Sequence, residues 1–248
     1  MRVGRREAVR VALACGGKPA MNAPDSASGG AAETTETPDP AAELLREKCW
    51  TLARNLWWSW HQDATSLFRD MDPVAWRAFE HNPIALLSGM SPAQFATRVA
   101  ALSLHGRIHA AHERLQQYMS ETPQGARTHT ATLRWRPVAY FSWEFGLQES
   151  LQTYFGRLAV LAGDHLKTAS DMGVPMVGVG LFGPQARVRQ SLDHLGWQRE
   201  EYWHLDPGVL PLEPARGADG NPLLLNIPTR LGKLYAKRRG CFRYHVER

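Results

Sequence analysis

The sequence predicts an α/β protein in which a helical N-terminal subdomain precedes a parallel βαβ unit. Apolar residues recur at helical spacing between Leu45 and Met119. Two short apolar runs, Val138–Ser142 and Met176–Leu181, have the length and composition of buried strands. A helical pattern through Leu166 separates them, and a strand, a helix and a second strand in this order place the two strands parallel in one sheet.

Proline pairs mark the starts of the predicted N-terminal helices. Asp39-Pro40 and Asp72-Pro73 place a capping residue before a proline at the first helical position. Ser91-Pro92-Ala93-Gln94 has the form of a capping box, and we expect it to open one long helix that runs to Met119. Asn82-Pro83 breaks the chain before the apolar run Ile84–Leu87. Later in the chain, Gly173 suits the left-handed position that ends a helix.

The helical region concentrates tryptophan, since five of the nine tryptophans lie between Trp50 and Trp76. Indole rings can stack on sugars, but the helical spacing of these residues favours a core role. His105, His109 and His112 share one helix face, and three imidazoles could ligate zinc. No carboxylate or cysteine follows in step, so we favour a packed or solvated histidine stripe and predict no metal site.

Composition limits the class of protein. The 248 residues are 44% hydrophobic, which suits a globular protein with a sizeable core. The net charge of +5 arises at the two ends of the chain and implies no broad basic face, so we expect no nucleic-acid partner. No apolar run approaches the roughly 18 residues of a membrane-spanning helix. Cys15, Cys49 and Cys241 form no close pair, which favours a reducing, cytoplasmic setting.

The chain divides into four predicted segments. Residues 1–40 are expected to be a disordered leader, because residues 18–40 contain almost no large apolar side chain. Translation is expected to begin at Met21 rather than Met1. Residues 41–133 form the helical region and residues 134–237 a partial α/β domain. Residues 238–248 form a basic tail without strand alternation. We favour a reading-frame shift near Lys237 as its origin over a basic interaction tail.

Residues 138–202 carry a series of unusual motifs. They include Tyr140-Phe-Ser-Trp-Glu-Phe-Gly146, Leu161-Ala-Gly-Asp-His-Leu-Lys167, Gly173-Val-Pro175 and Gly196-Trp-Gln198. This stretch resembles the N-terminal domain of the α-glucan phosphorylases, the glycogen and maltodextrin phosphorylase family. The Trp-rich block at 55–60 and the segment at 81–87 look like the helical extension of the bacterial and archaeal branch. The similarity covers about residues 42 to 236.

The resemblance implies a Rossmann-like, two-domain glycosyltransferase, of which this chain would be the N-terminal portion only. The family carries out reversible phosphorolysis of α-1,4-glucan to glucose 1-phosphate. Its pyridoxal phosphate is held by a lysine of the C-terminal domain, and the cofactor phosphate relays a proton. The implied partners are glucan, phosphate, and either a second copy of the chain or a separately encoded C-terminal half.

The family's glycine-rich turn at the start of a helix lets backbone N–H groups approach a phosphate. By resemblance, the substrate and phosphate loop here comprises Glu144, Gly156, Arg157 and Leu158. Only Gly156 remains of the three family glycines. Gly183–Gln190 also departs from the family pattern.

The other residues that match the family are assigned no chemical role. Asp164 and His165 match family residues, but a capping or packing role is favoured for both. Lys167 matches a family helix lysine and is not the cofactor lysine. No catalytic residue is assigned, and we do not expect the chain alone to hold pyridoxal phosphate. The expectation is an incomplete, inactive fragment. The alternatives are a non-catalytic remnant that binds glucan or a partner, and a frameshifted pseudogene product.

Overall fold

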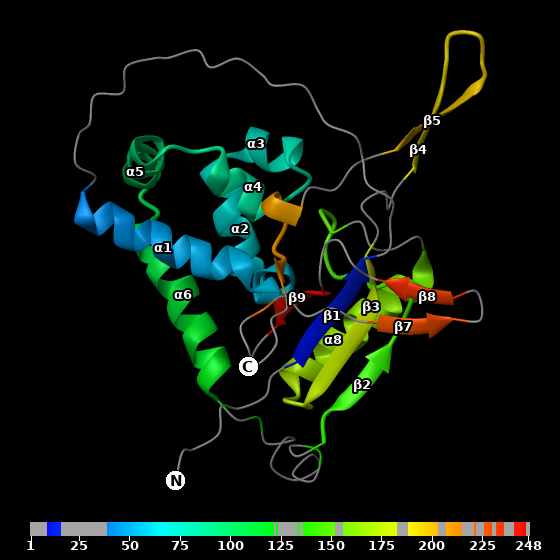
Figure 1. Cartoon of the computed structure of the whole chain (residues 1–248). Helices are drawn as coiled ribbons and strands as arrows, with labels where there is room; N and C mark the ends of the chain where they lie inside the picture. The colour runs from blue at the N-terminus through cyan, green and yellow to red at the C-terminus, as the bar shows by residue number, and fades with distance from the viewer. Residues whose placement is uncertain are drawn as a thin grey trace.

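A computed structural model describes residues 9–15, 39–121, 123, 133, 136–151, 156–182, 188–202, 207–214, 221, 226–229, 232–235 and 241–246. Helices α1 to α6 gather on one side of the molecule, and the sheet with helix α8 lies on the other (Figure 1). The chain is therefore a mixed protein with a helical N-terminal part and a strand-containing second part.

The helical part consists of short helices, of which α1, α3, α4 and α5 begin at the predicted proline pairs. They are α1 (Pro40–Arg54), the 3-10 turn η1 (Leu56–Trp60), α2 (Gln62–Met71), α3 (Pro73–Ala78), α4 (Pro83–Ser88), α5 (Pro92–Ala101) and α6 (His105–Ser120). The side chains of Asp39, Asp72 and Asn82 accept hydrogen bonds from the backbone N–H groups of the first turn. Ser91 and Gln94 form the predicted capping box.

The long helix predicted to run from Ser91 to Met119 is two helices. Helix α5 ends at Ala101, and Ser103 adopts a left-handed φ of 52° that a helix cannot continue through. The N–H groups of Ser103 and Leu104 donate to the carbonyl oxygens of Ala100 and Val99, so the end is closed as a Schellman motif. Leu102, which follows the last residue of α5, is 48% exposed.

The predicted βαβ unit is present. Strands β2 (Val138–Phe141) and β3 (Met176–Phe182) are parallel, with Val138 opposite Met176, and α8 (Arg157–Asp171) connects them. Gly173, after the end of α8, has a φ of 66°. Its N–H donates to the Ser170 carbonyl oxygen, which confirms the left-handed position predicted there.

The same sheet contains strands that the sequence did not predict. Its order is β2-β3-β1-β9-β6, with β1 (Val9–Cys15) parallel to β3 and β9 (Cys241–Val246) antiparallel to β1. The short β6 (Glu213–Pro214) pairs with β9. Residues 9–15 thus depart from the disordered leader, and residues 241–246 from a tail without a strand. Both strands depend on partners distant in the sequence, which local patterning does not reveal.

Two antiparallel pairs complete the described structure. Strands β4 (Val188–Leu192) and β5 (Gln198–Tyr202) form a hairpin that projects away from the rest of the chain (Figure 1). Strands β7 (Asn226–Thr229) and β8 (Gly232–Tyr235) form the other, and the 3-10 turn η3 (Pro207–Val209) precedes β6. The apolar run at 223–227 overlaps β7 at residues 226 and 227, and its residues 223–225 lie outside the described residues.

The buried side chains form two clusters. The first fills the helical part and includes Trp57, Trp58 and Trp76, which confirms the predicted core role for these three tryptophans. The second lies between α8, the segment after β2 and the segment after η3. Trp60 packs against both clusters, so the two hydrophobic cores are continuous.

Polar contacts join the two parts where α6 meets the end of α8. The Tyr118 hydroxyl lies 2.6 Å from the Ser170 Oγ and donates to an Asp171 carboxylate oxygen at 2.8 Å. The Trp60 indole N–H donates to the same carboxylate at 3.3 Å. These bonds hold α8 in a fixed position relative to the helical part.

Candidate functional site

Helix α8 packs against the segment after β2 without room for a side chain. A Cβ atom added at Gly163 would lie 2.2 Å from the Gly146 carbonyl oxygen. The Gly146 N–H in turn donates to the Ala159 carbonyl oxygen at 2.7 Å. The two backbones therefore touch directly, and residues 144–146 run beside the first turns of α8.

The predicted loop residues lie at this contact. Gly156 occupies the N-cap of α8, and Arg157 and Leu158 follow on the first turn with exposed side chains. Glu144 is half-buried in the segment after β2, and its carbonyl oxygen accepts a hydrogen bond from the Ser142 hydroxyl at 2.8 Å. The structure thus brings all four residues to one end of α8, beyond the carboxyl end of β2.

Gly156 is not required by the local geometry. Its φ of 179° is extended backbone that any residue adopts, and no atom lies within 4 Å of where its Cβ would be. Because glycine has no side chain, nothing at the N-cap accepts hydrogen bonds from the first N–H groups of α8. An N-terminus of this kind favours an anion through its N–H groups and its positive dipole end.

Arg157 and Leu158, on the first turn of α8, both have exposed side chains. Arg157 adds a cation where the family pattern has glycine. Leu158 is 80% exposed and Leu161 is 64% exposed. On the same helix, Ala162, Leu166 and Ala169 are buried.

The other residues of α8 that match the family are Asp164, His165 and Lys167. His165 is exposed, with its ring centroid 5.1 Å from that of Tyr140. Lys167 is half-buried, and burial lowers the pKa of its ammonium while the nearby Asp164 carboxylate opposes that shift. The capping or packing role expected for Asp164 and His165 stays a prediction.

The histidine stripe on α6 contacts α1. The Lys48 ammonium lies 2.7 Å from the Nδ1 atom of His109, and the pKa of His112 is lowered first by burial and then by the Lys48 charge. Among the described residues, no group of three or more His, Cys, Asp or Glu side chains is arranged to hold a metal ion.

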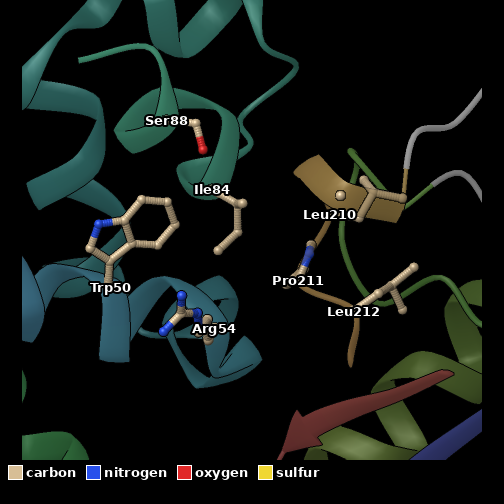
Figure 2. Close-up of a pocket in the computed structure, with 8 residues that line it drawn as sticks. Trp50, Arg54, Ile84, Ser88, Leu210, Pro211 and Leu212 are labelled. Carbon is tan, nitrogen blue, oxygen red and sulfur yellow. The ribbon is translucent and has the colours of Figure 1, made fainter. Parts of the chain in front are cut away.

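A separate cavity of about 510 Å³ lies between the helical part and the segment after η3 (Figure 2). Its lining comprises Trp50, Arg54, Ile84, Ser88, Gly208, Leu210, Pro211 and Leu212. Sequence reasoning did not single out this set. In the sequence, the cavity is indicated only by the spacing of Trp50 and Arg54, which lie four residues apart and therefore on one face of α1.

Within the described residues, no helix combines the length and the apolar character needed to cross a membrane.

Comparisons with known proteins agree with the motifs. Residues 44–151 match a family described as a protein of unknown function, DUF3417. The chain is 40% identical to a glycogen phosphorylase of Mycobacterium tuberculosis over 181 residues, which are 71% of this chain and 21% of that protein. It is 33% identical to a maltodextrin phosphorylase of Thermococcus litoralis over 187 residues, 75% of this chain and 22% of that protein.

A glycogen phosphorylase of Aquifex aeolicus is 32% identical over 193 residues, 78% of this chain and 27% of that protein. No solved structure matches the chain significantly. The chain spans about a fifth to a quarter of the length of these relatives. Over about three quarters of its residues, the chain is therefore homologous to the glycogen and maltodextrin phosphorylases.

Proposed function

We propose that the chain supplies the N-terminal, phosphate-facing part of an α-glucan phosphorylase, an enzyme that converts α-1,4-glucan and phosphate to glucose 1-phosphate. The observation that carries this proposal is the open start of α8. There Gly156, Arg157 and Leu158 begin the helix whose backbone contacts Gly146, two residues after Glu144, beyond the carboxyl end of β2. In open α/β sheets, ligands bind beyond the carboxyl ends of parallel strands. From the family resemblance we further propose a Rossmann-like arrangement of the sheet and a cytoplasmic enzyme.

In this proposal the chain binds and orients phosphate. The N–H groups at the start of α8 donate to the anion, whereas the side chains of Arg157 and Ala159 take up space that glycine leaves open in the family. Glu144 lies beside the same helix end and accepts from a sugar hydroxyl. The chain's contribution is thus positioning and electrostatic stabilisation of a phosphorylated sugar.

The described residues do not fit pyridoxal phosphate. The half-buried Lys167 lies within α8 beside Asp164, and the cavity near Trp50 is lined by Arg54 and Ser88 without a lysine. We assign the cofactor lysine to no described residue and derive no step through the cofactor. We accordingly propose that the 248-residue chain by itself does not form glucose 1-phosphate.

Exposed apolar side chains at the same end of α8 support a partner in this role. Phe141 ends β2, Trp143 follows it, and Leu158 and Leu161 lie on α8, all with more than half of their surface exposed. Large exposed apolar patches mark interaction surfaces. We propose that the remaining part of a phosphorylase, in the same or another polypeptide, covers this face.

A segment exchange tests the proposed function. The 181-residue matched segment of the Mycobacterium tuberculosis relative is replaced by the corresponding residues of this chain. Glucose 1-phosphate formation is then measured from maltodextrin and phosphate. We expect turnover, and we expect the paired change Arg157→Gly and Ala159→Gly to raise it at least tenfold, about 1.4 kcal/mol of transition-state stabilisation.

Arg136→Gly is the matched control, because Arg136 is an exposed arginine before the amino end of β2. It should leave the rate unchanged. A folded exchange protein with no turnover, with or without the restored glycines, would refute the proposed function. An unchanged rate after glycine restoration would show that Arg157 replaces the glycine contacts.

A further inference from the structure

A half-buried glutamine connects the segment after β2 to the helical part. Gln148 follows Glu144 by four residues, directly after the backbone that touches α8. The side-chain nitrogen of Gln148 donates to the His81 carbonyl oxygen at 2.9 Å. Because His81 lies between α3 and α4, this hydrogen bond joins the segment that carries Glu144 to a turn of the helical part.

Both ends of the Gln148 amide have partners. Its side-chain oxygen accepts from the Ser150 N–H at 2.8 Å and contacts the Ser150 hydroxyl. A backbone N–H can only donate, which places the amide oxygen on Ser150 and the amide nitrogen on the His81 carbonyl oxygen. Ser150 is 5% exposed, and the Leu151 N–H donates to the Gln148 carbonyl oxygen at 3.1 Å. The segment itself therefore orients the Gln148 side chain toward His81.

The turn that presents the His81 carbonyl oxygen is conformationally constrained. Glu80 and His81 both adopt left-handed φ angles, 51° and 60°. Such angles in non-glycine residues persist where surrounding contacts determine them. The His81 N–H donates to the Trp76 carbonyl oxygen at 2.8 Å. The next residue, Asn82, is 4% exposed and donates from its side chain to the Val209 carbonyl oxygen at 2.7 Å. The acceptor for Gln148 is thus fixed from both sides.

The residues before Gln148 are packed between this hydrogen bond and α8. Phe145 and Leu147 are 1% and 3% exposed and belong to the same hydrophobic cluster as Leu56 of the helical part. Between them, the Gly146 N–H donates to a carbonyl oxygen of α8 at 2.7 Å. Close-packed interiors transmit strain, so a displacement at Gln148 reaches the backbone that lies against α8.

We propose that Gln148 is a positioning residue for the phosphorylase reaction. Its bond to the His81 carbonyl oxygen places the segment that carries Glu144 relative to the start of α8. The inference rests on the proposed function, in which Glu144 accepts from a sugar hydroxyl. Gln148 acts through Glu144 and does not contact the substrate. The helical part, which contacts no substrate in the proposed function, thereby sets part of the geometry of the site.

The first test measures kinetics in the segment-exchange protein. Gln148→Glu keeps an oxygen for Ser150 but replaces the donor, so a carboxylate faces the His81 carbonyl oxygen. We expect kcat to fall about tenfold, while the KM for inorganic phosphate and for maltodextrin stays within about twofold, because misplacement of Glu144 slows the chemical step. Glu149→Gln is the matched control, the opposite exchange at the exposed neighbouring position, and it should leave kcat and both KM values unchanged.

A double-mutant cycle separates positioning from a loss of folded protein. In the Glu144→Ala background, Gln148→Glu should change kcat by less than about twofold, because the group that Gln148 positions is gone. A purely structural role would lower kcat by the same factor in both backgrounds. That outcome, or a fall in kcat of equal size in Glu149→Gln, would overturn the positioning role.

Hydrogen exchange in the full chain tests the same link without turnover. In Gln148→Glu the Gly146 N–H should exchange about tenfold faster, because its local opening costs less free energy. The Ile108 N–H, which donates to the Leu104 carbonyl oxygen at 2.9 Å and belongs to a residue 0% exposed, should exchange at an unchanged rate. Equal acceleration at both N–H groups would show general destabilisation and overturn the proposal.

The kinetic outcomes also distinguish this inference from the proposed function. Absence of turnover in the unmodified segment-exchange protein would refute the proposed function and with it the role of Gln148 in the reaction. Turnover that Gln148→Glu leaves unchanged would refute the positioning role alone.

Discussion

Gly163→Ala tests the direct backbone contact that places the candidate loop. Gly163 lies within α8, where alanine is normally the better helix former by about 1 kcal/mol. Its added methyl group would lie 2.2 Å from the Gly146 carbonyl oxygen and 2.7 Å from the Gly146 carbonyl carbon. These are backbone atoms that no rotamer change can move, so α8 must shift away from residues 146–147.

The magnitude follows from three contributions. A clash of this size lies at the upper end of overpacking costs, about 3 kcal/mol. The same shift lengthens the bond from the Gly146 N–H to the Ala159 carbonyl oxygen, which costs about 1 kcal/mol. The gain in helix propensity offsets about 1 kcal/mol. We expect Gly163→Ala to lower the free energy of unfolding by about 3 kcal/mol.

Gly106→Ala is the matched control, because Gly106 also lies in a helix, α6, and no atom lies within 4 Å of its added Cβ. It should be neutral or raise the free energy of unfolding by up to about 1 kcal/mol. Urea unfolding of the full chain, followed by tryptophan fluorescence and circular dichroism, compares the variants. Equal stability of Gly163→Ala and Gly106→Ala would refute the close contact.

Two further predictions concern the junction between α6 and α8. Tyr118→Phe removes the hydroxyl that hydrogen-bonds to Ser170 and Asp171. Because Ser170 is buried, the free energy of unfolding in urea should fall by about 1–2 kcal/mol. An unchanged unfolding midpoint would contradict this. Burial lowers the pKa of His61 from 6.5, so the unfolded chain binds more protons below that pH. Its contribution to stability is present above about pH 6.5 and is lost as the pH falls toward the folded-state pKa. The free energy of unfolding should therefore rise less steeply with pH, between pH 5 and 8, in His61→Asn than in the control His194→Asn. Identical slopes would refute the assignment of this pH dependence to His61.

The local features of the fold followed from the sequence because they depend on neighbouring residues. Asp39, Asp72 and Ser91 cap helices since their side chains reach N–H groups two or three positions ahead. Gly173 ends α8 because it tolerates a left-handed conformation. The parallel arrangement of β2 and β3 followed from the order of apolar runs.

The candidate loop was identified by resemblance, and its surroundings were not predictable. Neither Gly146 nor Gly163 signals in sequence that the two backbones touch. The exposure of Leu158 is likewise decided by which face of α8 the sheet covers. Helical periodicity predicts a helix but does not by itself orient it against a particular partner.

The sequence alone determined the starts of the four helices that begin at proline pairs, the βαβ order, the tryptophan core and the family resemblance, because these depend on short-range chemistry and residue identity. The tertiary structure decided the break at Ser103, the pairing of β1 with β3 and β9, and the cavity beside Trp50. Each of these joins or depends on segments whose contact is set by packing of the whole chain. Such contacts are stabilised by the apolar surface that distant segments bury together, and a short stretch of sequence does not show which segments those are.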